Sequence, residues 1–435
     1  MKRSLTKAGL LAAVLLAAAS AFSQSPIRAN AERMEARIKA LSKIGLNKNG
    51  GSDRVAYTEY DRQGREYIIG LMKNAGLEVR IDTAANIIGR RKGKFDDRKP
   101  IVFGSHIDTV PNGGAYDGCV GVIGAIEVIE LLNENKITTE NPLEVTVFTD
   151  EEGGLTGSRG MAGALGKEAL TVMNNSGRAI GEGIRFLGGD PARLAEAVRQ
   201  KGDVKAYLEL HIEQGGVLES RGLDIGVVEG IVGIEWWEVT IEGFANHAGT
   251  TPMKGRRDAV LAGARFALMV NEVVNSYEGA QVGTVGKFIA EPGAPNVIPG
   301  RAILSLEIRD LSSEKIRKIY DEIVESASAI AKETGTTISF RHLDVSAVPA
   351  LTSERIKSEI EGSAKSLGLS FQRMPSGAGH DAQDMAKFAP IGMIFVPSKG
   401  GISHSPKEFT SAKDMANGAS VLFNTVLRID HAPSL

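Results

Sequence analysis

The chain has almost no cysteine, few aromatic residues and no surplus of either charge. Its single cysteine, Cys119, among 435 residues excludes an internal disulfide and a cysteine-based zinc site. Lysine and arginine total 51 against 53 for aspartate and glutamate, so no basic face for nucleic acid and no acidic tail are expected. Aromatic residues make up 5% beside 51 glycines, which favours an α/β protein with many tight turns.

A hydrophobic run long enough to span a membrane is also absent. The N-terminal apolar stretch, Ala8–Ala21, covers 14 residues, fewer than the roughly 20 that a spanning helix needs. It follows basic residues and ends in Ala19-Ser20-Ala21, a small-residue pattern typical of a cleavage site. We therefore predict that residues 1–23 are a signal peptide, and that the mature protein is periplasmic or secreted and free of the membrane. An uncleaved N-terminal anchor is the alternative.

The length of the chain and the order of its apolar patterns indicate two domains. A chain of 435 residues exceeds what one ordinary core organises. Strand and helix patterns alternate, which is typical of an α/β domain with a mainly parallel sheet flanked by helices. We predict a catalytic domain in two parts, residues 24–229 and 344–435, with an inserted domain at residues 230–343.

In the catalytic domain, the expected helices are Ala31–Ile44, Asp61–Ala75, Val120–Glu134, Ser353–Leu367 and Ala412–Leu427. The expected strands are Leu77–Ile81, Asn86–Arg90, Ile101–Phe103, Glu144–Phe148, Tyr207–His211 and Met393–Val396.

The inserted domain has a pattern of its own, beginning at Ile225–Gly233. Its apolar spacing predicts the order β-α-β-β-α-β, a split βαβ or ferredoxin-like unit of about 110 residues. Its elements are Trp236–Glu242, Asp258–Ser276, Gln281–Ile289, Arg301–Arg309, Ser313–Glu333 and Thr337–Arg341. We interpret this unit as a lid that closes over a substrate, with hinges near Glu229-Gly230 and Leu343–Val348.

Metal-ligand side chains follow the expected strand Ile101–Phe103. His106 and Asp108 are two residues apart on an extended segment, so both point the same way and Asp108 can accept the second ring N–H of His106. Asp117 lies in a glycine-rich turn, where a lone aspartate would usually cap the next helix. Beside His106, a carboxylate that bridges two cations is the better interpretation. A buried His–Asp pair without metal is the alternative.

Two adjacent glutamates, Glu151 and Glu152, follow the next strand. Like charges this close in a partly buried site repel strongly unless a cation neutralises them. One glutamate can bind metal while the other acts as general base and then as general acid. Their spacing leaves the two roles unassigned, and a solvated turn is the alternative.

Four of the seven histidines lie at strand ends or in glycine-bearing loops of the expected catalytic domain: His106, His211, His380 and His404. One such histidine would more often be a hydrogen-bonded structural residue, but four beside carboxylates favour a metal centre. Cys119, at the start of a helix, is interpreted as a packing residue. We assign His342 and His431 to the surface.

Eight segments together carry a resemblance to a known family. They closely resemble the hydantoinase/carbamoylase branch of the M20 metallopeptidase-like amidohydrolases, and the match covers nearly the whole chain after the signal. The segments are Gly104–Val110, Tyr116–Gly118, Phe148–Gly153, Glu209–Gly215, Asn246–Pro252, Pro295–Gly300, Ser376–Ala382 and Gly401–Ser405.

The resemblance implies a centre of two divalent ions with Asp117 between them and Glu151 as the general base. Zinc is the expected metal, with manganese, cobalt and nickel as alternatives, since nitrogen and oxygen ligands suit several ions. Many peptidases of the superfamily carry a carboxylate where the ureido amidohydrolases, and this chain, carry His211. The implied ligands are His106, Asp117 and His211 for one ion, and Asp117, Glu152 and His404 for the other.

The resemblance also implies how a substrate is bound. It places Asn296 and Arg309 together on a substrate carboxylate, which a guanidinium fork can bind with two hydrogen bonds. Without the resemblance, an ion pair of Arg309 with a nearby acid would be the simpler interpretation. The other implied substrate contacts are Gln214, Gly379 and His380.

A further implied feature is a homodimer formed through the lid domain. Similar enzymes use the residue equivalent to His247 to stabilise the oxyanion in the active site of the partner subunit. Taken alone, His247 would be interpreted as part of a surface turn.

We predict an exported amidohydrolase that cleaves the ureido C–N bond of N-carbamoyl-L-amino acids. Its substrate is a small ureido or amide compound with a free carboxylate, and its products are the amino acid, ammonia and carbon dioxide. Allantoate and 3-ureidopropionate are alternative substrates, because they share both groups. An exported M20-type peptidase or N-acyl amino acid deacylase is favoured by the signal and disfavoured by His211. A binding protein without turnover is disfavoured by the intact set of ligands and Glu151.

Overall fold

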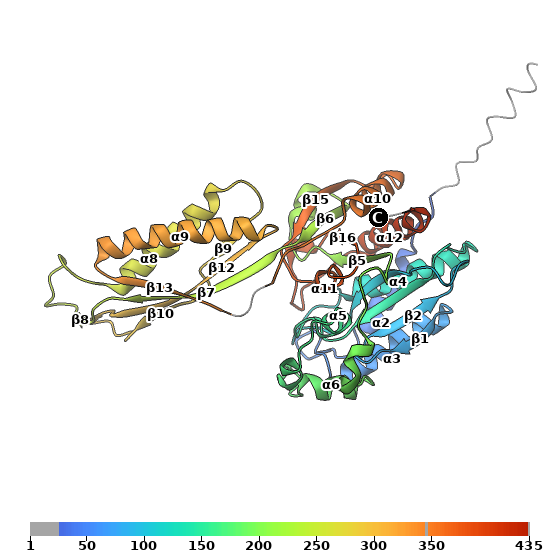
Figure 1. Cartoon of the computed structure of the whole chain (residues 1–435), viewed down its shortest axis with the longest axis horizontal. Helices are drawn as coiled ribbons and strands as arrows, with labels where there is room; N and C mark the ends of the chain where they lie inside the picture. The colour runs from blue at the N-terminus through green and yellow to red at the C-terminus, as the bar shows by residue number, and fades with distance from the viewer. Residues whose placement is uncertain (1–25, 344–346, 434–435) are drawn as a thin grey trace, which may run out of the picture.

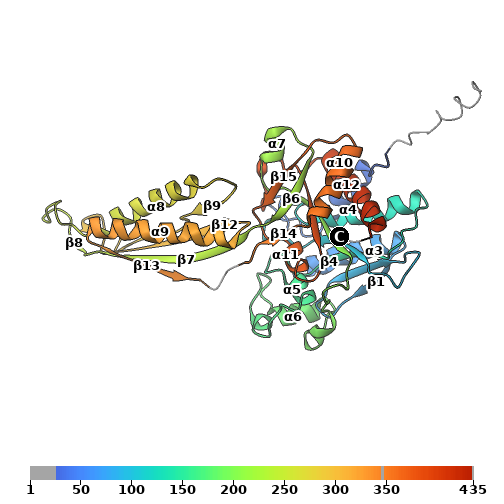
Figure 2. The ribbon, with the colours of Figure 1, turned by 45° about the horizontal axis from the view of Figure 1, so that its top comes forward.

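The computed structural model describes residues 26–343 and 347–433, so the predicted signal peptide lies outside the described residues. An elongated lid extends from a broader α/β body, and Figures 1 and 2 show this arrangement in two orientations. Among the helices that the structure describes, none is long and apolar enough to cross a membrane.

A nine-stranded sheet forms the centre of the body, in the order β1-β2-β4-β3-β5-β16-β6-β14, with β15 beside β6. The four central strands β4, β3, β5 and β16 run parallel, and antiparallel pairs occur toward both edges. The mainly parallel, helix-flanked sheet predicted from the sequence is confirmed. The strands are β1 Glu78–Ile81, β2 Ile87–Arg91, β3 Ile101–His106, β4 Leu143–Phe148, β5 Ala206–Ile212, β6 Ile225–Ile231, β14 Ala350–Leu351, β15 Phe371–Ser376 and β16 Ile391–Val396.

Both faces of the central strands are covered, because every residue of β3, β4, β5 and β16 is buried. Alternate residues enter different cores: Phe103 and Leu208 pack in one, and Val102 and Tyr207 in the other. The first core includes α2, α4, α10 and α12, and the second includes α11. The helices are α2 Ala31–Leu41, α3 Glu59–Asn74, α4 Cys119–Glu134, α5 Thr156–Met161, α6 Ile180–Phe186, α7 Val217–Arg221, α10 Glu354–Ser366, α11 Asp381–Met385 and α12 Ala412–His431.

The lid is a five-stranded antiparallel sheet in the order β10-β12-β7-β13, with β9 also on β12. Alternate residues of β12 are buried in the lid core, where α8 and α9 pack on the sheet. A short antiparallel pair, β8 with β11, lies at the far end of the lid from the body (Figure 1). The elements are β7 Gly233–Glu242, β8 Asn246–His247, α8 Ala259–Ser276, β9 Val282–Thr284, β10 Phe288–Glu291, β11 Val297–Ile298, β12 Arg301–Asp310, α9 Ser313–Thr334 and β13 Thr337–His342.

One expected lid strand, Gln281–Ile289, is interrupted. It forms β9 and β10, which pair with different parts of β12. Between them the Lys287 N–H donates to the Ser305 hydroxyl at 2.9 Å instead of to a strand carbonyl. The Ser305 hydroxyl thus takes the place of a backbone carbonyl acceptor in the hydrogen bonding along β12.

The lid joins the body through two chain crossings. The first is short, since β6 ends at Ile231 and β7 begins at Gly233. At the second crossing, Ala347 pairs with Ile234, and residues 344–346 of the predicted Leu343–Val348 hinge lie outside the described residues.

Candidate metal centre and active site

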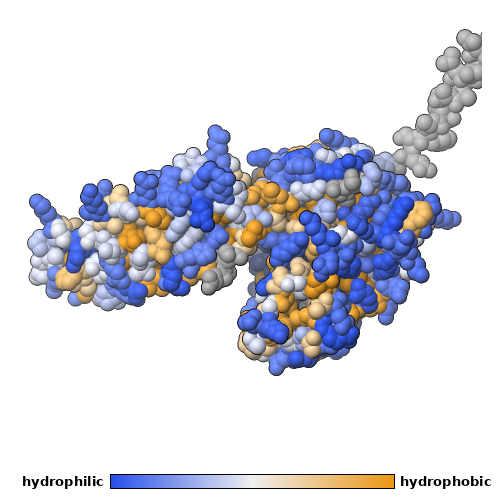
Figure 3. Space-filling model, viewed as in Figure 1, coloured by the Kyte–Doolittle hydropathy of each residue, from blue (hydrophilic) through white to orange (hydrophobic). Residues whose placement is uncertain are grey.

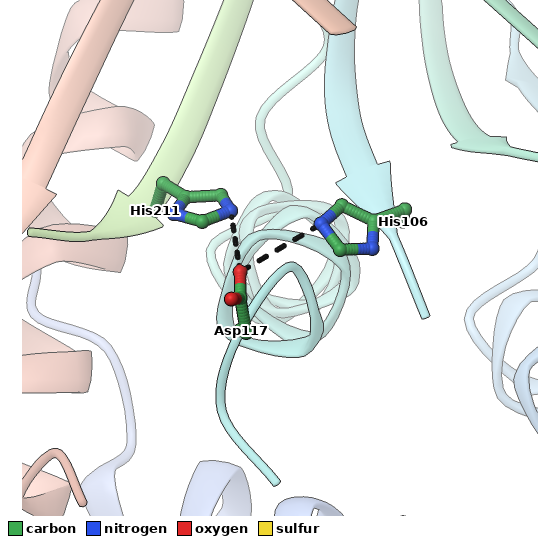
Figure 4. Close-up of side chains that lie close together, drawn as sticks. All are labelled: His106, Asp117 and His211. Atoms are coloured by element: carbon green, nitrogen blue, oxygen red, sulfur yellow. Dashed lines mark ion pairs between the residues drawn. The ribbon is translucent and has the colours of Figure 1, made fainter. Parts of the chain in front are cut away.

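Three chain segments meet at the carboxyl ends of the central strands. His106 is the last residue of β3, and His211 is the penultimate residue of β5. These strands are parallel neighbours, so their carboxyl ends lie at the same edge of the sheet. Asp117, in the turn before α4, points between the two imidazoles (Figure 4).

The two oxygens of Asp117 face different ligands. Oδ1 lies 3.1 Å from His211 Nε2 and 3.8 Å from His106 Nε2. Oδ2 lies 3.2 Å from His404 Nε2, which in turn is 3.4 Å from Glu152 Oε2. Two groups of three potential metal ligands therefore share Asp117, with the ligand atoms of each group within 4.8 Å of one another: His106, Asp117 and His211, and Asp117, Glu152 and His404.

Backbone carbonyls set the orientation of two of these imidazoles. His106 Nδ1 lies 3.1 Å from the Asp108 carbonyl, and His211 Nδ1 lies 3.0 Å from the Ile212 carbonyl. Each Nδ1–H can be donated there, which leaves Nε2 free as the metal ligand. We expected the Asp108 carboxylate to accept the His106 proton, but its Oδ1 is farther away, at 3.6 Å.

The charges of the site suit divalent cations. Burial, followed by the charge of Asp117, raises the pKa of Glu152 to about 7. The hydrogen bond to Asp117 raises the pKa of His404 to about 9 despite its partial burial. Both groups thus tend to hold protons among crowded carboxylates, and a cation can supply that positive charge instead. With imidazole nitrogens and carboxylate oxygens as donors, the residues present fit two divalent ions.

Glu151 belongs to neither group of ligands. Its Oε2 lies 3.7 Å from His106 Nε2, and its side chain is only 9% exposed. Burial and then the neighbouring Glu152 raise the pKa of Glu151 well above its usual value, although His106 opposes the shift. A carboxylate that is free of metal and holds a proton readily is suited to general acid–base chemistry.

A cavity of about 280 Å³ opens beside these ligands. It brings together Gln214, Arg309, Gly379 and His380, four of the residues predicted to contact substrate. Burial, with His211 nearby, lowers the pKa of His380 well below its usual value, so His380 is neutral. The remaining lining residues are Asp117, Glu151, Glu152, Leu155, His211, Ala378 and His404.

Arg309 reaches this cavity from the lid and is held by two contacts. Its Nε and Nη2 donate to the two oxygens of Glu307 at 2.8 and 3.1 Å. Its Nη1 donates at 2.7 Å to the carbonyl of Gly377, which belongs to the body. The guanidinium is thus fixed across the junction between lid and body.

Two predicted site residues do not reach the cavity within one chain. His247 pairs with Val297 at the far end of the lid, and the Asn296 carbonyl accepts the N–H of Ala248 there. The expectation that Asn296 and Arg309 lie together on a carboxylate is therefore wrong for a single chain. They flank opposite ends of β12, whose residues 301–309 extend over about 27 Å.

Sequence reasoning missed two acidic residues that hold the site. Glu307 lies two positions before Arg309 on β12, and strand periodicity could have identified this pair, because i and i+2 share a face. Glu408 lies four positions after His404 and is buried against the Asp117 turn. A glutamate in a loop is not part of any recognisable sequence pattern, so Glu408 could be identified only from its contacts in the structure.

The other residues considered in the sequence, Cys119, His342 and His431, lie outside the candidate site. Cys119 is fully buried in the body core and accepts a hydrogen bond from Arg54 Nη2 at 3.2 Å, in keeping with a packing role. His342 forms an exposed hydrogen bond with Glu235, and His431 is exposed at the end of α12.

Comparison with known proteins gives matches along most of the chain. Residues 102–428 match the model of peptidase family M20/M25/M40. The chain is 43% identical over 403 residues to an N-carbamoyl-L-amino acid amidohydrolase of Geobacillus stearothermophilus, covering 92% of this chain and 98% of that protein. It is 35% identical over 403 residues to an allantoate amidohydrolase of Bacillus subtilis, covering 90% and 96%.

A solved structure has the same architecture. The crystal structure of an amidase of the hydantoinase/carbamoylase family from Burkholderia multivorans aligns with a TM-score of 0.87 at 34% identity. The alignment covers 94% of this chain and 99% of that one.

Proposed function

Because the chain belongs to peptidase family M20/M25/M40, in its hydantoinase/carbamoylase branch, and is a hydrolase of that branch, we propose that it cleaves the ureido C–N bond of N-carbamoyl-L-amino acids. The products are the amino acid, ammonia and carbon dioxide. One observation carries the proposal. Asp117 is shared by two groups of potential metal ligands, and these lie beside a cavity that Arg309 lines.

The metal ligands and Glu151 have separate tasks in this proposal. Two divalent ions, zinc by preference, would polarise the ureido carbonyl and lower the pKa of the attacking water. Glu151 takes the proton of that water and passes it to the leaving nitrogen, which departs as the amine of the amino acid. The carbamic acid that remains breaks down to ammonia and carbon dioxide. The geometry that supports this role is the position of Glu151 on the cavity wall outside both groups of ligands.

Arg309 orients the substrate. Glu307 occupies its Nε and Nη2 edge, so the guanidinium can offer its remaining N–H groups to a substrate carboxylate. A ureido group at the metal centre and a carboxylate at Arg309 together fix both ends of a small molecule in the cavity.

The active unit in this proposal is a homodimer formed through the lid. His247 and Asn296 of one chain lie far from their own cavity, so they would act in the site of a second copy, where His247 stabilises the oxyanion. The lid also exposes apolar side chains on α8 and β10: Leu261, Leu268, Phe288 and Ile289. Figure 3 shows apolar patches on the lid surface among hydrophilic residues.

We further propose that residues 1–23 export the protein to the periplasm or medium. Cell fractionation of the full-length chain, with mass determination of the mature N-terminus, tests this part independently. Retention of the intact N-terminus in the cytoplasmic fraction would contradict it.

The proposed activity is tested by loading the metal-free protein with zinc, manganese, cobalt or nickel and measuring ammonia and amine release. The substrates are N-carbamoyl-L-amino acids, allantoate, 3-ureidopropionate, N-acetyl amino acids and dipeptides. We expect hydrolysis of the N-carbamoyl compounds and loss of that activity on chelation. Activity confined to allantoate or 3-ureidopropionate would change the substrate, and activity confined to dipeptides or N-acetyl compounds would overturn the ureido assignment.

A further inference from the structure

One buried carboxylate, that of Glu408, connects the two halves of the metal centre. Its Oε1 accepts the backbone N–H groups of Tyr116 and Asp117, at 2.8 and 3.0 Å. Its Oε2 accepts the hydroxyl of Ser403 at 2.9 Å. Ser403 directly precedes His404, so Glu408 links the turn that carries Asp117 to the loop that carries His404.

The chain leaves space for this carboxylate. Glu408 is only 5% exposed, and its side chain packs against Gly114 in the Asp117 turn. A Cβ on Gly114 would lie 2.1 Å from Glu408 Oε1, far closer than two such atoms can approach. The absence of a side chain at position 114 is therefore what lets Glu408 reach the backbone of the turn.

Ser403 lies between two carboxylates. Its Oγ is 3.0 Å from Asp117 Oδ2 and 2.9 Å from Glu408 Oε2, but a hydroxyl has one proton to donate. Asp117 Oδ2 is also the oxygen that faces His404, at 3.2 Å. This oxygen also accepts a hydrogen bond from Gln214 Nε2 at 2.8 Å. A Ser403 proton directed to Asp117 Oδ2 would add a second competitor for a cation, whereas a proton directed to Glu408 adds none.

We propose that Glu408 is a positioning residue of the metal centre, which holds the Asp117 turn and keeps the Ser403 proton away from the oxygen that serves the ion bound by Glu152 and His404. This inference rests on the metal-dependent hydrolysis proposed above. Glu408 touches no substrate in this role and acts through Asp117 and Ser403.

Replacing Glu408 by glutamine tests the direction of the Ser403 proton. The amide oxygen of Glu408→Gln can still accept the two backbone N–H groups, but its NH2 group must donate to Ser403 Oγ. The hydroxyl then turns toward Asp117 Oδ2. We expect the affinity for one of the two zinc ions to fall about 10–100-fold while the other is retained. Zinc titration against a chromophoric chelator, with metal content after dialysis at fixed free zinc, measures both affinities without any substrate.

A matched control separates this effect from the loss of a buried charge. Asp430 is also buried and also accepts two backbone N–H groups, from Glu140 and Asn141 at 2.7 and 2.8 Å, but it lies at the end of α12 away from the site. Asp430→Asn should bind both zinc ions as the unmodified protein does.

A double variant identifies Ser403 as the mediator. Ser403→Ala should retain both ions, because Glu408 still holds the turn. Adding Ser403→Ala to Glu408→Gln should restore part of the lost affinity, since no hydroxyl remains to compete for Asp117. A purely structural role for Glu408 predicts the opposite, because the double variant would then bind zinc no better than Glu408→Gln alone.

The identity of the weakened ion is checked with His404→Ala, which removes a ligand from one group only. Adding Glu408→Gln to His404→Ala should cause little further loss of the remaining ion. If Glu408→Gln does not fold, Gly114→Ala replaces it, because the new Cβ displaces Glu408 and should weaken the same ion.

Equal weakening of both ions by Glu408→Gln, or no recovery in the double variant, would overturn the inference. Failure of the proposed function looks different: the unmodified protein would bind zinc in these titrations and yet release no amine from ureido compounds.

Discussion

The carboxylate of Asp108 accepts the backbone N–H of Glu152 at 3.1 Å through Oδ2. Its Oδ1 accepts the N–H of Glu151 at 3.3 Å. Asp108 thus fixes the chain that carries both glutamates, while its own backbone carbonyl receives the ring proton of His106. Asp108 therefore helps to position two potential metal ligands, His106 and Glu152, and the proposed general base Glu151.

Asp108→Asn is therefore expected to lower kcat/KM about 10–100-fold with both metals retained. An amide has one acceptor oxygen, so one of the two glutamate N–H groups would face an NH2 group. Asp82→Asn is the control, because Asp82 is also buried and accepts backbone N–H groups, from Ala84 and Asn86, away from the ligands. Steady-state kinetics and metal analysis of both variants test the prediction, and equal rates in the two would contradict it.

The adjacent glutamates should respond differently to the same substitution. Glu151→Gln removes the proposed base but no metal ligand, so we expect both metals to stay and kcat to fall about 10²–10⁴-fold. Glu152→Gln should instead lose the ion shared with His404. Metal analysis beside turnover distinguishes the two outcomes, and a Glu151→Gln protein that loses a metal yet keeps its rate would reverse the assignment.

Arg309→Lys tests recognition of the substrate carboxylate. Lysine keeps the charge but cannot hold Glu307 with two parallel hydrogen bonds and also reach Gly377 and a substrate. We expect KM for N-carbamoyl-L-amino acids to rise about 10-fold or more, by about 1.4 kcal/mol of lost binding, with a smaller change in kcat. A ureido compound without a carboxylate, at high concentration, is the control substrate and should be hydrolysed equally by both proteins.

Mixing two inactive variants tests whether His247 acts in a partner's site. In a mixed dimer, one chain carries His247→Ala and the other carries Glu151→Gln. One of the two sites would then combine Glu151 of the first chain with His247 of the second. Random exchange of subunits should then restore about a quarter of the normal activity, since half of the dimers are mixed and each has one complete site. Each variant alone should stay inactive. A mixture that also stays inactive after verified exchange would mean that His247 does not act across the dimer.

The α/β body was predictable because its signals are local. The strands from Ile101, Leu143 and Ala206 are rich in apolar residues, and residues with metal-binding chemistry lie at their carboxyl ends or directly after them. Parallel strands bring His106 and His211 to one edge of the sheet. Their grouping with Asp117, which lies in a turn, was implied by the family resemblance.

The remaining features depend on tertiary contacts that no local pattern records. β6 and β15 were not predicted, although β15 pairs with β6 along its length. The contact of Glu408 with Asp117 joins residues 291 positions apart. The separation of Asn296 from Arg309 depends on how the chain crosses the lid, whereas the motifs give only their order.

Asp61 is buried in the first turn of α3 and provides a test of buried charge in the metal-free protein. Burial raises the pKa of this carboxyl to about 7, against the partial compensation of Arg65. The folded state therefore holds a proton on Asp61 that the unfolded chain releases above about pH 4. Between about pH 4 and pH 7 the folded state binds more protons, so this group makes stability fall as pH rises, by up to about 1.4 kcal/mol per pH unit.

Asp61→Asn removes this dependence while keeping an acceptor for the Tyr57 N–H, which Asp61 Oδ2 accepts at 2.8 Å. We expect the variant to gain stability relative to the unmodified protein as pH rises from about 4 to 7, with a constant difference above that range. Urea unfolding of both metal-free proteins at a series of pH values gives this difference directly, and the other titrating groups cancel because both proteins contain them. A difference that stays flat across the range would mean that Asp61 is ionised in the fold, because the charge of Arg65 then outweighs the cost of burial.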